Sequence, residues 1–349
     1  MIDIKLLEQL CLCNGISGDE GNVRNLIINE IKDSADDIKT DNLGNLIVFK
    51  KGKKSAKSKL MVSAHMDEVG LMVTDITSDG YLKFDEVGGI DRRVLPGKRV
   101  CVGRNGLNGV IGVKPIHLTN GDEKTAVPKM SDMYIDIGAE NREDALKYVN
   151  YGDSINFEGD FKINGKTVVT KALDDRFGCY VLINLIKSEP EYDMYFTFVV
   201  QEEVGLRGAR PAAFTVNPDF ALVIESTTAA DVAEVDVSHQ VCNLSKGATV
   251  TVMDRATVYD KEMISAAFEL AEKNNIAVQY KRAVAGGNDS GAIHQSRGGV
   301  RTLAVSLPSR YIHAPSTAAN LDDCESVLKL AKVLSDYIVG GNLAKGKTV

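Results

Sequence analysis

Four short apolar runs in this chain each lead to a side chain that can bind a metal ion. Buried parallel strands read as nearly continuous apolar runs, and open α/β sheets bind ligands at the carboxyl ends of such strands. Side chains far apart in the sequence would then meet at one edge of one sheet. The runs are 59–64 before His65, 194–200 before Glu202 and Glu203, 219–224 before Glu225, and 300–306, which continues to His313.

The segment between about residues 70 and 166 differs from the rest of the chain. It is rich in glycine, and its short alternating runs are separated by turn signals such as 78–80, 104–106 and 163–165. Regularly spaced short strands of this kind predict a small β-barrel or sandwich. We therefore expect an α/β catalytic domain, α/β/α in its layers, built from residues 1–69 and 167–349 and interrupted by an all-β, barrel-like insert at 70–166.

Helical spacing of apolar residues predicts helices in the flanking parts. One covers 3–13, and the sequence Ser17-Gly18-Asp19-Glu20 reads as a capping box that opens a second helix reaching about Lys32. Further helices are expected near 176–188, 259–274 and 322–339, and a tight turn is expected at 41–45.

Charge and composition exclude several classes of protein. The net charge is −7 and the sequence pI is about 5.4, which disfavours nucleic-acid binding because phosphate contacts need clustered positive charge. No apolar stretch approaches the roughly 18–20 residues of a membrane span, and the first residues lack a secretory signal. The six cysteines are scattered and include no C-x-x-C pair, as is typical of reduced thiols. We expect a soluble cytoplasmic protein with no membrane or nucleic-acid partner.

The residues after the first two runs are the first candidates for chemistry. Asp67, two residues after His65, can face the same way and fix the imidazole ring as a supporting carboxylate. Adjacent buried carboxylates, as at Glu202 and Glu203, repel each other and lose hydration, and a divalent cation offsets that cost. Because side chains alternate along a strand, one of the two can bind metal while the other faces a water molecule. The competing interpretation is a pair of exposed glutamates at the start of a loop.

The remaining candidates lie in the second half of the chain. A helix N-terminus explains one aspartate of the pair Asp174 and Asp175, and the other is free to bridge two cations. Either Glu225 or Asp231 could be a ligand, with Glu225 directly at the strand end. The loop 285–291 lacks the known phosphate-binding patterns, so we expect it to shape a substrate site. We expect the other histidines to be structural or exposed; they are His117, His239 and His294.

Mixed imidazole and carboxylate ligands suit zinc, cobalt or manganese better than calcium or magnesium. A set of two histidines and three carboxylates, one of them bridging, is typical of hydrolases with two metal ions about 3.5–4 Å apart.

This ordered set of motifs resembles the M42 family of dinuclear metallo-aminopeptidases over nearly the whole chain. The residues that carry the resemblance are 64–70 (AHMDEVG), 172–176 (ALDDR), 201–209 (QEEVGLRGA) and 311–313 (YIH), with 94–97 and 134–139 as further matches in the insert.

The resemblance implies a zinc-exopeptidase-like catalytic domain and a role for each candidate. It implies that His65 and His313 each bind one metal ion and that Asp174 bridges the two. Glu203 and Glu225 complete the two coordination shells. Glu202 is the implied general base, and Asp67 orients His65. The insert mediates dimerisation, and dimers of the family often form tetrahedral dodecamers. The family commonly has Asp where this chain has Glu225, and its Gly-Gly-Thr-Asp-Ala loop reads Gly-Gly-Asn-Asp-Ser at 286–290.

We therefore expect a metal-dependent aminopeptidase that removes N-terminal residues from short peptides, using a bridging water and Glu202 as its base. One alternative is a glycosidase, which needs two carboxylates and no metal; the absence of tryptophan and the 6% of aromatic residues give it few platforms for sugar rings. A second alternative is a non-catalytic metal-binding scaffold.

Overall fold

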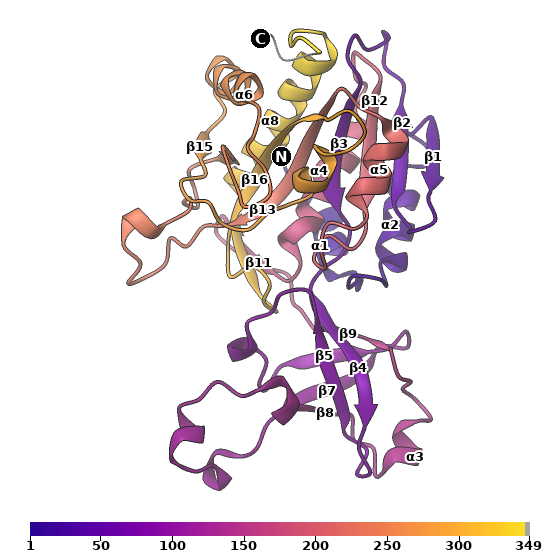
Figure 1. Cartoon of the computed structure of the whole chain (residues 1–349), viewed down its shortest axis with the longest axis vertical. Coiled ribbons are helices and arrows are strands. Elements are labelled where there is room, and N and C mark those ends of the chain that lie inside the picture. Colours follow the sequence, from indigo (N-terminus) through magenta and orange to yellow (C-terminus); the bar gives the residue numbers. More distant parts are fainter. Residues whose placement is uncertain (346–349) are drawn as a thin grey trace.

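The computed structural model describes residues 1–345 and shows two domains, one above the other in Figure 1. The larger domain is built on a mixed β-sheet with helices on both faces. The smaller is a closed antiparallel barrel inserted after the third strand of the large sheet. The predicted arrangement of an α/β domain interrupted by an all-β domain is confirmed.

The large sheet has parallel strands at its centre and antiparallel strands toward its edges. β3 lies between β12 and β13, β13 pairs with β16, and all three pairings are parallel. All six residues of β3 are buried, which explains its apolar run. In sheet order the strands are β1 (Asp37–Thr40), β2 (Leu46–Lys50), β12 (Met194–Val199), β3 (Leu60–His65), β13 (Phe220–Thr228), β16 (Arg301–Arg310), β17 (Thr317–Asn320), β11 (Thr167–Thr170) and β10 (Lys162–Asn164), with β14 (Ala248–Val250) and β15 (Val278–Tyr280) beside β16.

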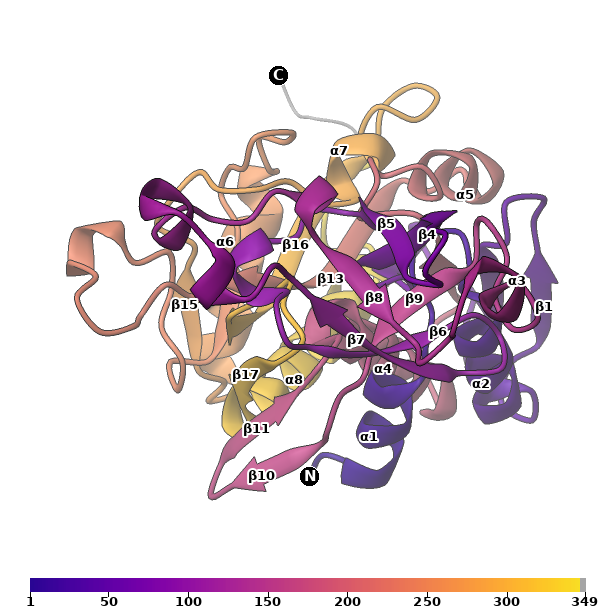
Figure 2. The same cartoon turned by 90° about the horizontal axis from the view of Figure 1, so that it is seen from below.

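Helices cover both faces of this sheet, so the domain has three layers (Figure 2). On one face α4 (Leu173–Lys187) and α8 (Leu321–Val339) pack against the central strands, with α1 (Ile4–Leu12) and α2 (Gly21–Ile31) beside α4. On the other face α5 (Ala209–Val216) and α7 (Ser290–Ile293) contact each other and the strands. α6 (Lys261–Lys273) packs against α8 and β16. The expected helices in the second half of the chain are confirmed.

The barrel closes through antiparallel pairs and has its own apolar core. Its strands in barrel order are β4 (Gly70–Ile76), β5 (Leu82–Val87), β8 (Tyr134–Asp136), β7 (Leu107–Gly112), β6 (Arg99–Val102) and β9 (Ser154–Phe157), and α3 (Arg142–Ala145) lies between β8 and β9. The last barrel strand ends at Phe157. β10, which the sequence prediction included in the insert, pairs with β11 in the larger sheet.

Two local predictions need correction. The segment Ser17–Glu20 is followed by a helix, but it does not form a capping box, because α2 has no side-chain cap. The Ser17 hydroxyl donates to Asp67 instead, and Glu20 accepts from the backbone of Gly18 and Gln201. Glu225 lies inside β13, which continues to Thr228, and is not at the end of that strand. Among residues 1–345, no helix is long and apolar enough to cross a membrane.

Candidate metal centre

Parallel strands bring the predicted ligands to one edge of the large sheet. β3 ends at His65, and the register of β12 sets Val199 beside it, so Glu202 and Glu203 follow directly at that edge. The register of β13 pairs Val223 with Ser63, which places Glu225 two residues further on, next to His65. Sheet order therefore explains how residues far apart in the chain converge.

Two groups of potential ligands share Asp174. One contains His65, Asp174 and Glu225, and the other contains Asp174, Glu203 and His313. His65 Nε2 lies 3.4 Å from Asp174 Oδ1, while His313 Nε2 lies 3.4 Å from Asp174 Oδ2. Each oxygen of one carboxylate thus faces a different imidazole, as a bridging ligand requires. All five predicted ligands are brought together.

Each group is completed by a glutamate. His65 Nε2 is 3.7 Å from Glu225 Oε2, and His313 Nε2 is 3.3 Å from Glu203 Oε2. The longer glutamate at position 225 thus reaches His65 from within its strand. Asp231, the alternative ligand, lies elsewhere and forms a two-pronged ion pair with Arg310 at 2.7 and 2.8 Å.

The neighbouring residues Asp174 and Asp175 have different structural roles. Asp175 is fully buried and accepts from the backbone N–H of Gly178 at 3.0 Å and of His65 at 3.3 Å. It therefore caps the regular part of α4, which follows it, and anchors the end of β3. Asp174 has extended backbone angles just before the regular helix, and its side chain makes no cap. A helix start thus explains Asp175, and Asp174 stays the predicted bridging ligand.

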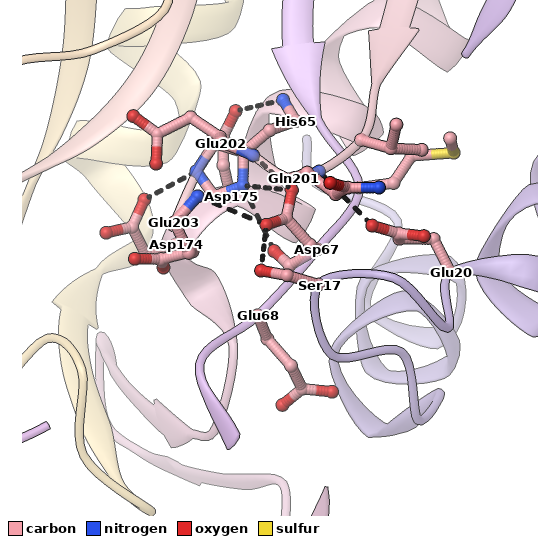
Figure 3. Close-up of polar contacts among 12 residues, drawn as sticks. Ser17, Glu20, His65, Asp67, Glu68, Asp174, Asp175, Gln201, Glu202 and Glu203 are labelled. Carbon is pink, nitrogen blue, oxygen red and sulfur yellow. Dashed lines mark hydrogen bonds and ion pairs between the residues drawn. The ribbon is translucent and has the colours of Figure 1, made fainter. Parts of the chain in front are cut away.

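Asp67 holds the segment that carries the two adjacent glutamates. Its carboxylate accepts from the backbone N–H of Glu202 at 3.0 Å and of Glu203 at 3.1 Å, and from the Ser17 hydroxyl at 2.6 Å (Figure 3). His65 Nδ1 lies 3.0 Å from the backbone oxygen of Asp67 and 3.5 Å from its carboxylate. Asp67 therefore positions His65 through its main chain and the glutamate pair through its side chain.

The backbone at this edge is held in unusual conformations. Ala172, Gln201, Tyr311 and His313 have positive φ angles of 53°, 57°, 60° and 58°. Non-glycine residues adopt this region at a cost, and such residues concentrate at functional sites. Glu20 supports one of them, because its carboxylate accepts from the Gln201 N–H at 3.2 Å (Figure 3).

Burying the carboxylates and imidazoles of these two groups without a cation costs free energy. Asp174 Oδ1 and Glu225 Oε1 are buried and have no hydrogen-bond partner within residues 1–345. Desolvation raises the pKa of Glu203 to about 7 and that of Glu225 well above its usual range. Burial lowers the pKa of His313, but Asp174 and Glu203 outweigh it and raise the value to about 9. Aligned carboxylates and imidazoles with unsatisfied buried oxygens are a donor set that fits divalent cations.

Glu202 is next to the two groups that share Asp174 but belongs to neither. It can form a third group with His65 and Glu203, and it lines a cavity together with His65, Asp174 and Glu225. Desolvation raises its pKa well above the usual range, and Asp289 and Glu203 add to that effect while His65 opposes it. A carboxylate so placed is suited to accept a proton near neutral pH.

The cavity beside Glu202 opens into a groove. The cavity has a volume of about 130 Å³ and includes the loop residues 285–288, so the predicted substrate-shaping loop does border the site. The groove has a volume of about 910 Å³ and runs between the two domains, with Ile90 and Arg93 on the barrel side. Both spaces are bordered by Ile312 and His313.

Several residues at the site were not found from the sequence. Lys281 lines the cavity, and Asp289 is fully buried nearby with both carboxylate oxygens unpartnered in the described part of the chain. Ser17 and Glu20 support the centre, although their sequence pattern indicated a helix cap. Asp289 lies in the loop 285–291, which the sequence analysis singled out, but no sequence motif marks Lys281. The three other histidines belong to none of the ligand groups found in residues 1–345.

An α/β sheet with a buried set of imidazoles and carboxylates at its edge, open to a long groove, defines a metal-dependent hydrolase. The chain belongs to the M42 family of peptidases: its sequence matches the M42 glutamyl aminopeptidase family over residues 44–330. It is therefore a metal-dependent aminopeptidase, and the family assignment leaves no support for the glycosidase or scaffold alternatives.

Named relatives agree with this assignment. The chain is 43% identical to a putative aminopeptidase of Acetivibrio thermocellus, covering 93% of this chain and 96% of the relative. It is 33% identical to the lysyl aminopeptidase of Pyrococcus furiosus, covering 97% and 98%. The structure of the Pyrococcus horikoshii TET1 peptidase, which can assemble into a tetrahedron or a large octahedral shell, superposes with a TM-score of 0.84 at 40% identity over 95% of this chain and 98% of that one.

Proposed function

We propose that this aminopeptidase removes N-terminal residues from short peptides with two divalent metal ions held by the two ligand groups. His65, Asp174 and Glu225 would hold one ion, and Asp174, Glu203 and His313 the other. The observation that carries this proposal is the position of Asp174, whose two oxygens face two different imidazoles at 3.4 Å each. The ligand chemistry favours zinc, with cobalt or manganese as alternatives.

Bound divalent ions would polarise the scissile carbonyl and lower the pKa of a water molecule in the site. Glu202, adjacent to both groups, would take a proton from that water as it attacks and pass it to the leaving amine. Asp67 fixes the backbone of Glu202 and so holds the base in place. The small cavity beside the centre would leave room for the N-terminal residue while the rest of the peptide lies in the groove, and this arrangement favours an exopeptidase.

The test of the general base is Glu202→Gln. The amide keeps the shape of the side chain but cannot accept the proton, so turnover of a chromogenic aminoacyl substrate should fall by roughly 10²–10⁴-fold. Metal content, measured by atomic emission, should stay at the wild-type level. Glu272→Gln, on the exposed surface of α6, is the matched control. Near-normal turnover by Glu202→Gln would rule out Glu202 as the general base. Chelation should abolish activity, and added Zn²⁺, Co²⁺ or Mn²⁺ should restore it.

We propose further that the chain works as a cytoplasmic homo-oligomer, a dimer or a tetrahedral dodecamer, assembled through the barrel domain. All six cysteines are free thiols, as is typical of a reducing compartment. A segment of the barrel domain exposes apolar side chains, among them Ile116 and Leu118. An exposed apolar segment on an otherwise polar surface is typical of an interface between subunits.

A further inference from the structure

Asp174, the carboxylate that both ligand groups share, lies in a short segment between two buried cations. Lys171 is three residues before it, and Arg176 is two residues after it. The side chains of these two cations are only 3% and 0% exposed. Lysine and arginine are almost never buried to this extent unless they are paired. The two positive charges therefore need a buried acid beside them.

Glu68 is the acid that pairs with both cations. Its Oε1 accepts from Lys171 Nζ at 2.9 Å and from Arg176 Nη2 at 3.2 Å. The Glu68 side chain is itself 5% exposed, so the two ion pairs are shielded from water. It belongs to none of the ligand groups found in residues 1–345, and its carboxylate points away from His65 in Figure 3. One carboxylate thus holds the segment 171–176 on both sides of the shared ligand.

The remaining contacts of the two cations fix them to the surrounding chain. Lys171 Nζ also donates to Asn14 Oδ1 at 2.9 Å. Arg176 donates to four backbone oxygens, those of Leu10, Cys13, Gly15 and Met66. Because Met66 directly follows His65, this guanidinium joins the segment that carries Asp174 to the end of β3. The network therefore sets the position of one ligand relative to another.

A very small cavity separates the network from the metal ligands. Glu68 and Lys171 line it on one side, and Asp174, Glu203 and His313 line it as well. Its volume is about 10 Å³, which is room for about one water molecule. So little free space leaves the Asp174 side chain few alternative positions as long as the ion pairs behind it stay in place.

We propose that Glu68 is a positioning residue that keeps Asp174 in its bridging position. Glu68 acts through Lys171 and Arg176, and it lines neither the cavity beside Glu202 nor the groove. This inference rests on the proposed function, because it assumes that Asp174 bridges two metal ions. An ion network with a purely structural role would change the stability of the protein but not its affinity for metal ions.

The deciding experiment is a titration of the chelated protein with Co²⁺. Glu68→Gln keeps the shape of the side chain but leaves two buried cations without a counter-charge. We expect the affinity for Co²⁺ to fall by roughly 10- to 100-fold, as is typical when a supporting partner of a metal ligand is lost. The absorption spectrum of the bound Co²⁺ should also change, because it reports the coordination geometry. At saturating Zn²⁺, kcat should fall while KM for a chromogenic aminoacyl substrate stays near the wild-type value.

Two further variants separate positioning from a loss of stability. Asp323→Asn is the matched control, because Asp323 is a buried carboxylate that accepts from the backbone N–H groups of Ser245 and Gly247 at 2.6 and 2.7 Å. It should lower the unfolding temperature of the chelated protein without changing its Co²⁺ affinity or spectrum. The double variant Glu68→Gln/Lys171→Met keeps the net charge of the network, so it should fold even where Glu68→Gln does not. It should show the same weakened Co²⁺ binding.

The outcomes distinguish the inference from the proposed function. Wild-type Co²⁺ affinity and spectrum in Glu68→Gln and in the double variant would overturn the inference and leave the two-ion centre standing. An equal loss of affinity in Asp323→Asn, or failure of both Glu68 variants to fold, would assign Glu68 to stability alone and overturn it too. Wild-type protein that binds fewer than two Co²⁺ ions per chain would overturn the proposed function instead.

Discussion

Asp67 is the residue on which most of the centre depends without being a ligand itself. Its carboxylate holds the backbone of Glu202 and Glu203, and its main chain contacts His65. In Asp67→Asn one of the two acceptor oxygens becomes a donor, so one of the contacts to the glutamate pair or to Ser17 is lost. Supporting partners of metal ligands typically contribute 10- to 100-fold in affinity or activity, and we expect losses of that order in both.

The Asp67 prediction is checked by titrating the chelated protein with Zn²⁺ and measuring kcat and KM on the same samples. Ser17→Ala is the matched comparison, because it removes a single hydroxyl donor to the same carboxylate. It should weaken metal binding far less than Asp67→Asn does. If Asp67→Asn binds zinc and turns over like the wild type, the supporting role assigned to this carboxylate is wrong.

The loop after β13 is tied to the end of β16 by Asp231 and Arg310. Burial raises the pKa of Asp231, but the hydrogen bonds from Arg310 and from the Leu244 N–H outweigh it, so the net pKa is lowered. A carboxyl group with a lowered pKa in the folded protein stabilises it above the unfolded pKa, about 4 for aspartate, and loses this contribution as the pH falls. Arg310 is partly exposed, so at pH 7 Asp231→Asn should cost only about 1 kcal/mol.

The pH dependence separates this ion pair from a metal site. Urea unfolding of the chelated protein should show the full difference between wild type and Asp231→Asn at pH 7, and the difference should shrink once the pH drops below about 4. Metal content at pH 7 should be the same in both proteins. A loss of bound zinc in Asp231→Asn would mean that Asp231 is a metal ligand.

The buried strands were predicted well because their apolar signal is local, whereas partners across the fold were not. The apolar run before His65 marks a buried strand, and all six residues of β3 are indeed buried. Ser17 was misread because a serine that contacts Asp67 and a serine that caps a helix have the same sequence pattern. Glu225 was placed at a strand end because its run of apolar residues stops there, but β13 continues by pairing with β16 as far as Thr228. Pairing between strands, which the sequence does not display, decided that boundary.

The arrangement of the two domains places the groove between the sheet edge and the barrel, and this could be foreseen only in outline. The character of residues 70–166 predicted a β-rich insert, and its closed barrel is confirmed. Which barrel residues line the groove, such as Ile90 and Arg93, depends on how the two domains pack, and no local sequence pattern predicts it. The same holds for Lys281, which only the packing of the fold brings to the wall of the cavity.

Assembly of the whole molecule can be tested at the segment between β7 and β8. This segment, the looped purple trace at the lower left of Figure 1, contains three short 3₁₀ helices and exposes Ile116, Leu118 and Val127 at 71%, 57% and 44%. Glutamates in a subunit contact of this kind would be desolvated without partners. We therefore expect the double variant Ile116→Glu/Leu118→Glu to have a lower mass by size-exclusion chromatography with light scattering.

The same double variant should still hydrolyse a small aminoacyl substrate, because these two residues lie outside the cavity and the groove. The control is Leu146→Glu, which adds a charge at a 42% exposed leucine beside α3 in the same domain. It should keep the wild-type mass. Equal masses for the wild type and the double variant would exclude the segment as a subunit interface. Equal loss of mass in the control would mean that added charge on this domain, and not the segment itself, disrupts the assembly.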